Sequence, residues 1–189
     1  KRTLNCTVQP TSMAPYSLVL ERATLDDIPA LTGLWYAGFT DPGVRYLWPD
    51  TPGVRRWWDD ANRQGLANKA YQHYMKVIDT NSKDRQGRPR TVAFAKWDMA
   101  TQEERGPRYP AWNQDMPLQA IESLDTLVTH PEYRRRGAGS MLMKWGCDLA
   151  DENGVEVYVD ASRDGSFLYR KFGFIVGLFF FFFFFFFFF

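Results

Sequence analysis

Residues 124–150 read LDTLVTHPEYRRRGAGSMLMKWGCDLA, and this stretch decides the fold. It begins as an apolar run of strand type, passes through the basic, glycine-rich residues 134–139, and continues with apolar residues at helical spacing. The order is therefore strand, turn, helix. Such a turn directs several backbone N–H groups and a helix dipole at one point, and its two glycines let an oxygen atom approach the main chain. We therefore predict a site for a pyrophosphate group at this turn.

The spacing of the glycines distinguishes among phosphate-binding turns. A Walker A loop requires a lysine directly after its second glycine, whereas Ser140 follows Gly139 here, which argues against a nucleotide-dependent kinase or ATPase. A Rossmann turn requires a third glycine three residues after Gly139, and that position is Leu142. What remains is the pattern Arg-x-x-Gly-x-Gly, carried by Arg134, Gly137 and Gly139.

This turn and a second motif resemble the GNAT (Gcn5-related) N-acetyltransferases, in which the turn binds acetyl-CoA. Residues just upstream fit the same motif: Val128, Pro131 and Tyr133. The second motif, Leu-Tyr-x-Lys-x-Gly-Phe, is carried by Leu168, Tyr169, Lys171, Gly173 and Phe174. The opening of the first strand and helix, RATLDD at residues 22–27, is also similar to this family. The resemblance spans residues 18–177 and is most specific in its last third.

The resemblance implies an α/β (α+β) domain with the GNAT acyl-CoA N-acyltransferase fold. This fold has a central mixed, mostly antiparallel sheet of six or seven strands, flanked by helices. We expect a flexible arm over residues 1–15 and a single domain over residues 16–178. Residues 179–189 are all phenylalanine, and this run is too short for a spanning helix of about 20 apolar residues. We interpret it as standing in for unassigned or altered sequence and leave it out of functional reasoning.

Composition narrows the class of protein. The 189 residues suffice for one domain with its own core. Cys6 and Cys147 form no disulfide framework, and no apolar segment follows Lys1 and Arg2 as in a secretory signal, so we expect a cytoplasmic, intracellular protein. The net charge of +1 argues against a nucleic-acid partner, and no His/Cys cluster suggests a metal. We expect no membrane partner, and a monomer or homodimer.

The resemblance also implies the reaction and the cofactor contacts. GNAT enzymes transfer an acyl group from a CoA thioester to an amine, so the implied activity is an N-acetyltransferase, an acyltransferase for groups other than aminoacyl groups. Acetyl-CoA is the implied cosubstrate, and direct transfer is expected because Cys147 lies inside the predicted helix. The cofactor contacts carried over are Leu127, Val128, Thr129, Arg134, Arg135, Arg136, Gly137, Ala138, Gly139 and Ser140.

Two residues are assigned to proton transfer. The second motif makes Tyr169 the proton donor to the leaving thiolate, since a phenol is protonated at neutral pH; the alternative is a core tyrosine under the cofactor site. Asp125 is the candidate base, because it shares with Ser123 the strand face that looks toward the acceptor in the family. Glu122 replaces it if a bulge exchanges the faces, and Asp125 equally suits a role in positioning the substrate ammonium.

The acceptor side is assigned from the most variable region of the family. Trp48, Trp57 and Trp58 fall in that region, and with Ser123 they are predicted to bind a small-molecule or peptide amine. The alternative is that these indoles cover the core, since Trp is mostly buried in any role. A rival from another class is a non-catalytic acyl-CoA-binding or regulatory module on the same fold.

Overall fold

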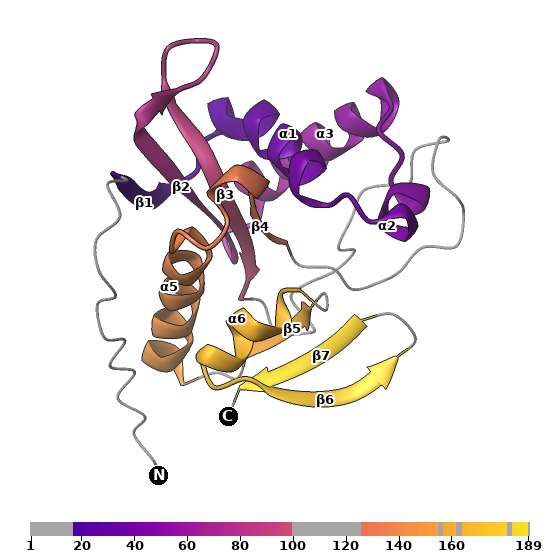
Figure 1. The fold of residues 1–189 in the computed structure, drawn as a ribbon, viewed down its shortest axis with the longest axis vertical. Coiled ribbons are helices and arrows are strands. Elements are labelled where there is room, and N and C mark those ends of the chain that lie inside the picture. The colour runs from indigo at the N-terminus through magenta and orange to yellow at the C-terminus, as the bar shows by residue number, and fades with distance from the viewer. Residues whose placement is uncertain (1–16, 100–125, 155–156, 162–163, 181–182, 189) are drawn as a thin grey trace.

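The computed structural model describes residues 17–99, 126–154, 157–161, 164–180 and 183–188. Its centre is a four-stranded sheet with helices on both faces (Figure 1). The strands are β1 (Leu18–Arg22), β2 (Gln72–Lys83), β3 (Pro89–Asp98) and β4 (Leu127–Thr129), paired antiparallel in that order. No helix in these ranges is long and apolar enough to cross a membrane.

The β2–β3 hairpin is the longest pairing in this sheet. Its turn is closed by Asp84, whose Oδ1 accepts hydrogen bonds from the backbone N–H groups of Gln86 (2.9 Å) and Arg88 (2.8 Å). The register shifts where Val77 pairs with Ala93 but Ile78 pairs with Thr91, so Val92 is an extra residue in β3. An inserted residue reverses the alternation of a strand, and Val92 therefore joins the same core as its neighbour Ala93.

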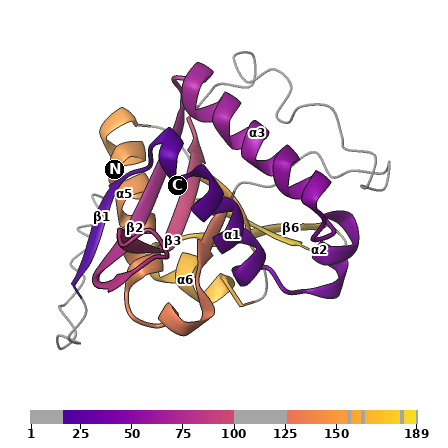
Figure 2. The ribbon, with the colours of Figure 1, turned by 90° about the horizontal axis from the view of Figure 1, so that it is seen from above.

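Three helices follow β1 and build one side of the molecule. They are α1 (Ile28–Gly38), α2 (Pro42–Leu47) and α3 (Pro52–Asn68), and Figure 2 shows α1 and α3 on one side of the strands with α5 on the other. Side chains cap two of them: Asp41 Oδ1 accepts from the Gly43 N–H (2.8 Å), and Thr51 Oγ1 from the Val54 N–H (3.2 Å). The core beneath α1 and α3 includes Leu31, Leu34, Trp35, Trp48, Trp57, Trp58, Phe94 and Val128.

The opposite face is covered by α5 (Ala138–Asn153), followed by α6 (Ser166–Lys171). The buried Leu142, Met143 and Cys147 of α5 pack in one core with Ala93 and Ala95 of β3. A second, three-stranded antiparallel sheet contains β5 (Val157–Ala161), β6 (Ile175–Phe180) and β7 (Phe183–Phe188) in the order β5-β7-β6. The described strands thus form sheets of four and three, and the phenylalanine run supplies the middle strand of the smaller sheet.

A buried ion group joins β1, β2 and the segment before α1. Lys76 Nζ lies 2.7 Å from Asp27 Oδ1 and 3.0 Å from Glu21 Oε1. Asp27 Oδ2 also accepts hydrogen bonds from Thr24, from its backbone N–H (2.8 Å) and from its hydroxyl (2.9 Å). Burial raises the pKa of Asp27, but the hydrogen bonds from Lys76 and Thr24 outweigh burial and hold that pKa below its usual value. This group fixes the start of α1 against the sheet.

Candidate cofactor and acceptor site

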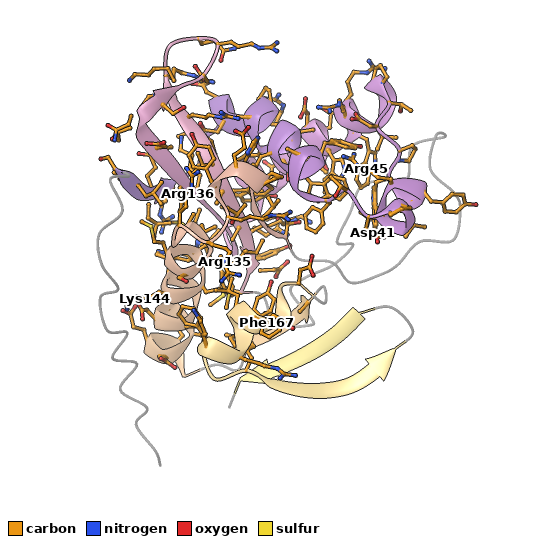
Figure 3. The ribbon with its side chains drawn as sticks, in the orientation of Figure 1. Asp41, Arg45, Arg135, Arg136, Lys144 and Phe167 are labelled. Carbon is orange, nitrogen blue, oxygen red and sulfur yellow. The ribbon has the colours of Figure 1, made fainter. Side chains whose placement is uncertain are left out.

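The turn between β4 and α5 has a backbone suited to an anion. Arg135 (φ 62°) and Gly137 (φ 95°) lie in the left-handed region, whereas Arg134 is extended (φ −61°, ψ 151°). Alternating conformations of this kind turn successive N–H groups toward one side of the chain. The first N–H groups of α5, which have no partner within the helix, follow directly. Backbone donors therefore converge at this end of α5, beside the labelled Arg135 and Arg136 in Figure 3.

The two glycines of the turn differ in their surroundings. A Cβ on Gly137 would meet no atom within 4 Å, so the space above it is open. A Cβ on Gly139 would lie 3.2 Å from Leu168 Cδ2, because α6 packs over this position. The turn is thus open to a ligand on the side of Gly137 and closed on the side of α6.

The arginine side chains of the turn have separate surroundings. Arg134 donates from Nη2 to the carbonyl oxygen of Gly38 (3.0 Å), which links the turn to the C-terminal end of α1. The guanidinium of Arg136 lies 5.0 Å from the ring centre of Tyr133, a cation–π distance. Arg135 is exposed. Arg134 is therefore held by protein, while Arg135 adds positive charge at the open side of the turn.

His130 belongs to the frame of the turn. Its Nδ1 accepts a hydrogen bond from the Glu132 N–H (3.3 Å) at the start of the 3₁₀ turn η2 (Pro131–Tyr133), and its Nε2 lies 3.1 Å from Arg90 Nη2. Burial and the neighbouring charge of Arg90 lower the pKa of His130 below its usual value. The ring is therefore neutral near pH 7 and supports the turn that precedes Arg134.

Strand β4 leaves an edge open beside the turn. Lys96 N–H donates to the Thr126 carbonyl (2.8 Å), and His130 N–H donates to the Val92 carbonyl (2.8 Å). In an antiparallel pair these bonds alternate along the strand, so the backbone of Val128 also faces β3. Leu127 and Thr129 direct their N–H and carbonyl groups to the other edge, where no described strand pairs with β4.

Tyr169 lies on α6 in the core shared with α5. Its side chain is 6% exposed, and its ring makes an edge-to-face contact with Phe174, with centroids 5.9 Å apart. The preceding residue, Leu168, is the one that packs against Gly139. The second motif therefore lies directly beside the turn, although Leu168 and Gly139 are separated by about thirty residues of sequence.

The three tryptophans predicted for the acceptor side are buried between α1, α2 and α3. Trp48, Trp57 and Trp58 are 2%, 7% and 6% exposed. Trp58 lies 5.0 Å from Trp35 and 5.1 Å from Trp57 between ring centres. All three belong to the core on this face, and Trp58 also lines a small cavity.

That cavity lies between α1, α3 and the edge of the sheet. Its volume is about 10 Å³. The lining residues come from four segments of the chain: Thr32, Trp35, Trp58, Asn62, Phe94, Lys96 and Thr126. Sequence reasoning did not single out Thr32, Asn62 or Lys96. A signal was present for Thr32 and Asn62, since each interrupts an otherwise apolar face of its helix.

The remaining predicted residues, Ser123 and Asp125, lie outside the described residues, as does Glu122. Thr126, the first described residue after them, faces the cavity. Within the described part of the chain, no three His, Cys, Asp or Glu side chains are grouped so that they would hold a metal ion.

Comparison with known proteins confirms the family resemblance and the fold. Residues 97–176 match the family model for the acetyltransferase (GNAT) domain. A stretch of 54 residues is 39% identical to an Ajellomyces capsulatus protein named "Probable acyltransferase SID5"; it covers 26% of this chain and 40% of that protein.

Solved structures extend the likeness to most of the chain. The PaiA N-acetyltransferase of Thermoplasma acidophilum, solved with coenzyme A, has a TM-score of 0.58 at 14% identity, over 90% of this chain and 98% of that one. A Corynebacterium glutamicum structure described as histone acetyltransferase HPA2 and related acetyltransferase has a TM-score of 0.56 at 17% identity, over 90% and 95%. At these identities the likeness establishes the fold.

Proposed function

We propose that this chain, which has the GNAT fold and carries a GNAT acetyltransferase domain over residues 97–176, is an acetyl-CoA-dependent N-acetyltransferase. The observation on which the proposal rests is the turn after β4, where Arg135 and Gly137 are left-handed at the start of α5. This backbone forms an anion site without any side chain. The open space at Gly137 fits the close approach of a pyrophosphate.

The cofactor contacts follow from the turn and the free edge of β4. Backbone N–H groups from Arg135 to Ser140 hold the pyrophosphate, with charge from Arg135 and Arg136. Leu127 and Thr129 pair with the pantetheine arm, because their backbone groups face away from β3. Val128 supports this edge through its side chain, which packs under α1. An N–H of the same edge polarises the thioester carbonyl.

Acetyl-CoA supplies a thioester whose carbonyl carbon is attacked by an amine. Tyr169 donates a proton to the sulfur as the carbon–sulfur bond breaks, and its place beside Leu168 and Gly139 supports this role. Asp125, or Glu122, removes the proton from the acceptor ammonium before attack. Ser123 and the indole of Trp58 contact the acceptor, and Trp48 and Trp57 hold Trp58 in place.

Calorimetry with acetyl-CoA tests the cofactor site. Gly137→Asn is the informative variant, because asparagine tolerates a left-handed backbone and its side chain would fill the open space. We expect its affinity for acetyl-CoA to fall at least about tenfold, or ~1.4 kcal/mol.

Gly87→Asn is the matched control. Gly87 has a similar backbone (φ 77°) and equally open surroundings, but lies in the β2–β3 turn. Equal affinity of the two variants and the parent would contradict the proposed site. Binding of acetyl-CoA without release of free CoA in the presence of any amine would instead favour the non-catalytic acyl-CoA-binding module.

A further inference from the structure

Two residues that line the cavity between α1, α3 and β3 carry buried polar atoms without a partner. Thr32 and Trp35 are 3% and 2% exposed. Within the described residues, neither Thr32 Oγ1 nor Trp35 Nε1 has a hydrogen-bond partner. A buried polar atom without a partner is unfavourable, and native proteins rarely contain one without a reason. Both residues line the same cavity, which points to a group that binds there.

The chemistry of the wall defines that group. The indole N–H of Trp35 and the ammonium of Lys96 only donate hydrogen bonds, and the hydroxyls of Thr32 and Thr126 can donate as well. The complement is an oxygen atom with lone pairs. Lys96 adds a positive charge, and the ring of Tyr74, 5.6 Å from its Nζ, lies beneath it. A carboxylate oxygen fits these donors better than an amine or a neutral apolar group.

The cavity also lies where the acceptor must come. Thr126 precedes β4, and the phosphate-binding turn follows the other end of the same strand. From residue 126 to residue 129 the strand advances about 10 Å. A pantetheine arm that runs along the open edge from the turn therefore brings its thioester toward the end of β4 at which the cavity lies.

We propose that this cavity binds one carboxylate oxygen of the amine acceptor, so that the enzyme selects amines that also carry a carboxylate. The inference rests on the proposed acetyltransferase function and specifies its substrate class. The volume of about 10 Å³ admits one oxygen, with the rest of the acceptor lying outside the cavity toward β4. Thr32, Trp35 and Lys96 are the specificity-determining residues.

Matched acceptors test the proposal. Pairs that differ in the carboxylate, such as lysine against 1,5-diaminopentane and phenylalanine against phenethylamine, are compared by kcat/KM with saturating acetyl-CoA. We expect the carboxylate-bearing member of the productive pair to be preferred on the order of 10- to 100-fold, as for a charged hydrogen bond. Lys96→Met is expected to remove this preference by lowering only the kcat/KM of the carboxylate-bearing amine.

Lys144→Met is the control for the loss of a lysine. Its ammonium lies on the exposed side of α5, 2.7 Å from Asp148, and the variant is expected to keep the preference. Preference of the parent for amines without a carboxylate, or an equal loss for both members of a pair in Lys96→Met, would overturn the proposal. Absence of turnover with every amine would refute the acetyltransferase function. The assignment of the cavity as a ligand site would then be tested by thermal unfolding alone.

Thermal unfolding of Thr32→Val provides that second measurement. Valine keeps the shape of threonine and removes the unpaired hydroxyl, so we expect the midpoint of the free protein to rise by roughly 2–4 °C. The same variant is expected to weaken the carboxylate preference. An unchanged or lower midpoint would show that the hydroxyl holds a structural water only, and would overturn the assignment of the cavity to substrate.

Discussion

Replacing Gly146 by alanine tests how α5 is seated on the sheet. In an exposed helix interior this change stabilises a protein by about 0.5–1 kcal/mol, because glycine loses more backbone entropy on folding. At Gly146, however, a Cβ would lie 2.2 Å from Cζ2 of Trp97, and 2.3 Å and 2.4 Å from two further atoms of the same indole. Normal carbon–carbon contacts are about 3.5–4.0 Å, so the ring or the helix must move by more than about 1 Å.

The indole cannot yield easily, because Trp97 lies on β3 and is only 8% exposed. Overpacking of a core costs about 1–3 kcal/mol, which exceeds the helix-propensity gain. We therefore expect Gly146→Ala to lower the free energy of unfolding by about 1–2 kcal/mol and the thermal midpoint by roughly 2–8 °C.

Gly33→Ala is the matched control for this change. Gly33 lies inside α1, and a Cβ there would meet no atom within 4 Å. We expect this variant to gain about 0.5–1 kcal/mol. Urea unfolding followed by tryptophan fluorescence measures both changes. If Gly146→Ala were as stable as Gly33→Ala, the close contact between α5 and Trp97 would be refuted.

Three further predictions follow from other parts of the molecule. Tyr169→Phe is expected to keep acetyl-CoA affinity and lower turnover on the order of 10²-fold; full turnover would mean that the thiolate is protonated by another group. Asp27→Asn is expected to lower the free energy of unfolding by about 3 kcal/mol at pH 7. This lies at the low end of the cost of breaking a buried ion pair, because Glu21 still lies beside Lys76. Because the pKa of Asp27 is lowered on folding, its contribution to the free energy of unfolding is present above the unfolded-state pKa of about 3.9 and is lost as pH falls through the folded-state pKa. If urea unfolding gave the same difference between the parent and Asp27→Asn at every pH, this linkage would be contradicted. Arg135→Gly is expected to raise stability by about 0.5–1 kcal/mol in thermal unfolding, since glycine tolerates φ 62°, and a loss would show that the arginine side chain stabilises the turn.

Local backbone requirements made the turn between β4 and α5 predictable. Gly137 and Gly139 are spaced for a turn and a helix start, and the structure begins α5 at Ala138. The left-handed Arg135 was not predictable, because any residue type other than glycine disfavours that conformation and only the surrounding packing imposes it.

A Pro-Gly pair usually indicates a turn, but in this structure both such pairs begin a helix. Pro42 and Pro52 each occupy the first position of a helix, after a capping Asp41 or Thr51. Proline is favoured there, since it needs no hydrogen bond for its nitrogen. The capping residue before each proline therefore predicts the start of a helix more reliably than the Pro-Gly pair predicts a turn.

The residues that line the proposed acceptor cavity were harder to predict from the sequence. Thr32 and Lys96 line one cavity only when α1 lies across β3, and two other helices and strand β2 separate them in the sequence. The indoles of Trp48, Trp57 and Trp58 pack in the core, in line with the alternative that they cover it. Of the three, Trp58 also lines the cavity. Their role toward a substrate stays a prediction.

Helix α1 has a consequence for protein engineering. Its middle supplies Thr32 and Trp35 to the cavity, and its last residue, Gly38, accepts the hydrogen bond of Arg134. A Cβ on Gly38 would also lie 2.0 Å from Val128, so the helix end needs glycine to approach β4. We therefore expect a chimera that exchanges α1 to remove a support of the turn between β4 and α5 as well. If the proposed cofactor and acceptor sites hold, we expect a graft that does not retain Gly38 and its carbonyl position to change acceptor choice and cofactor affinity together.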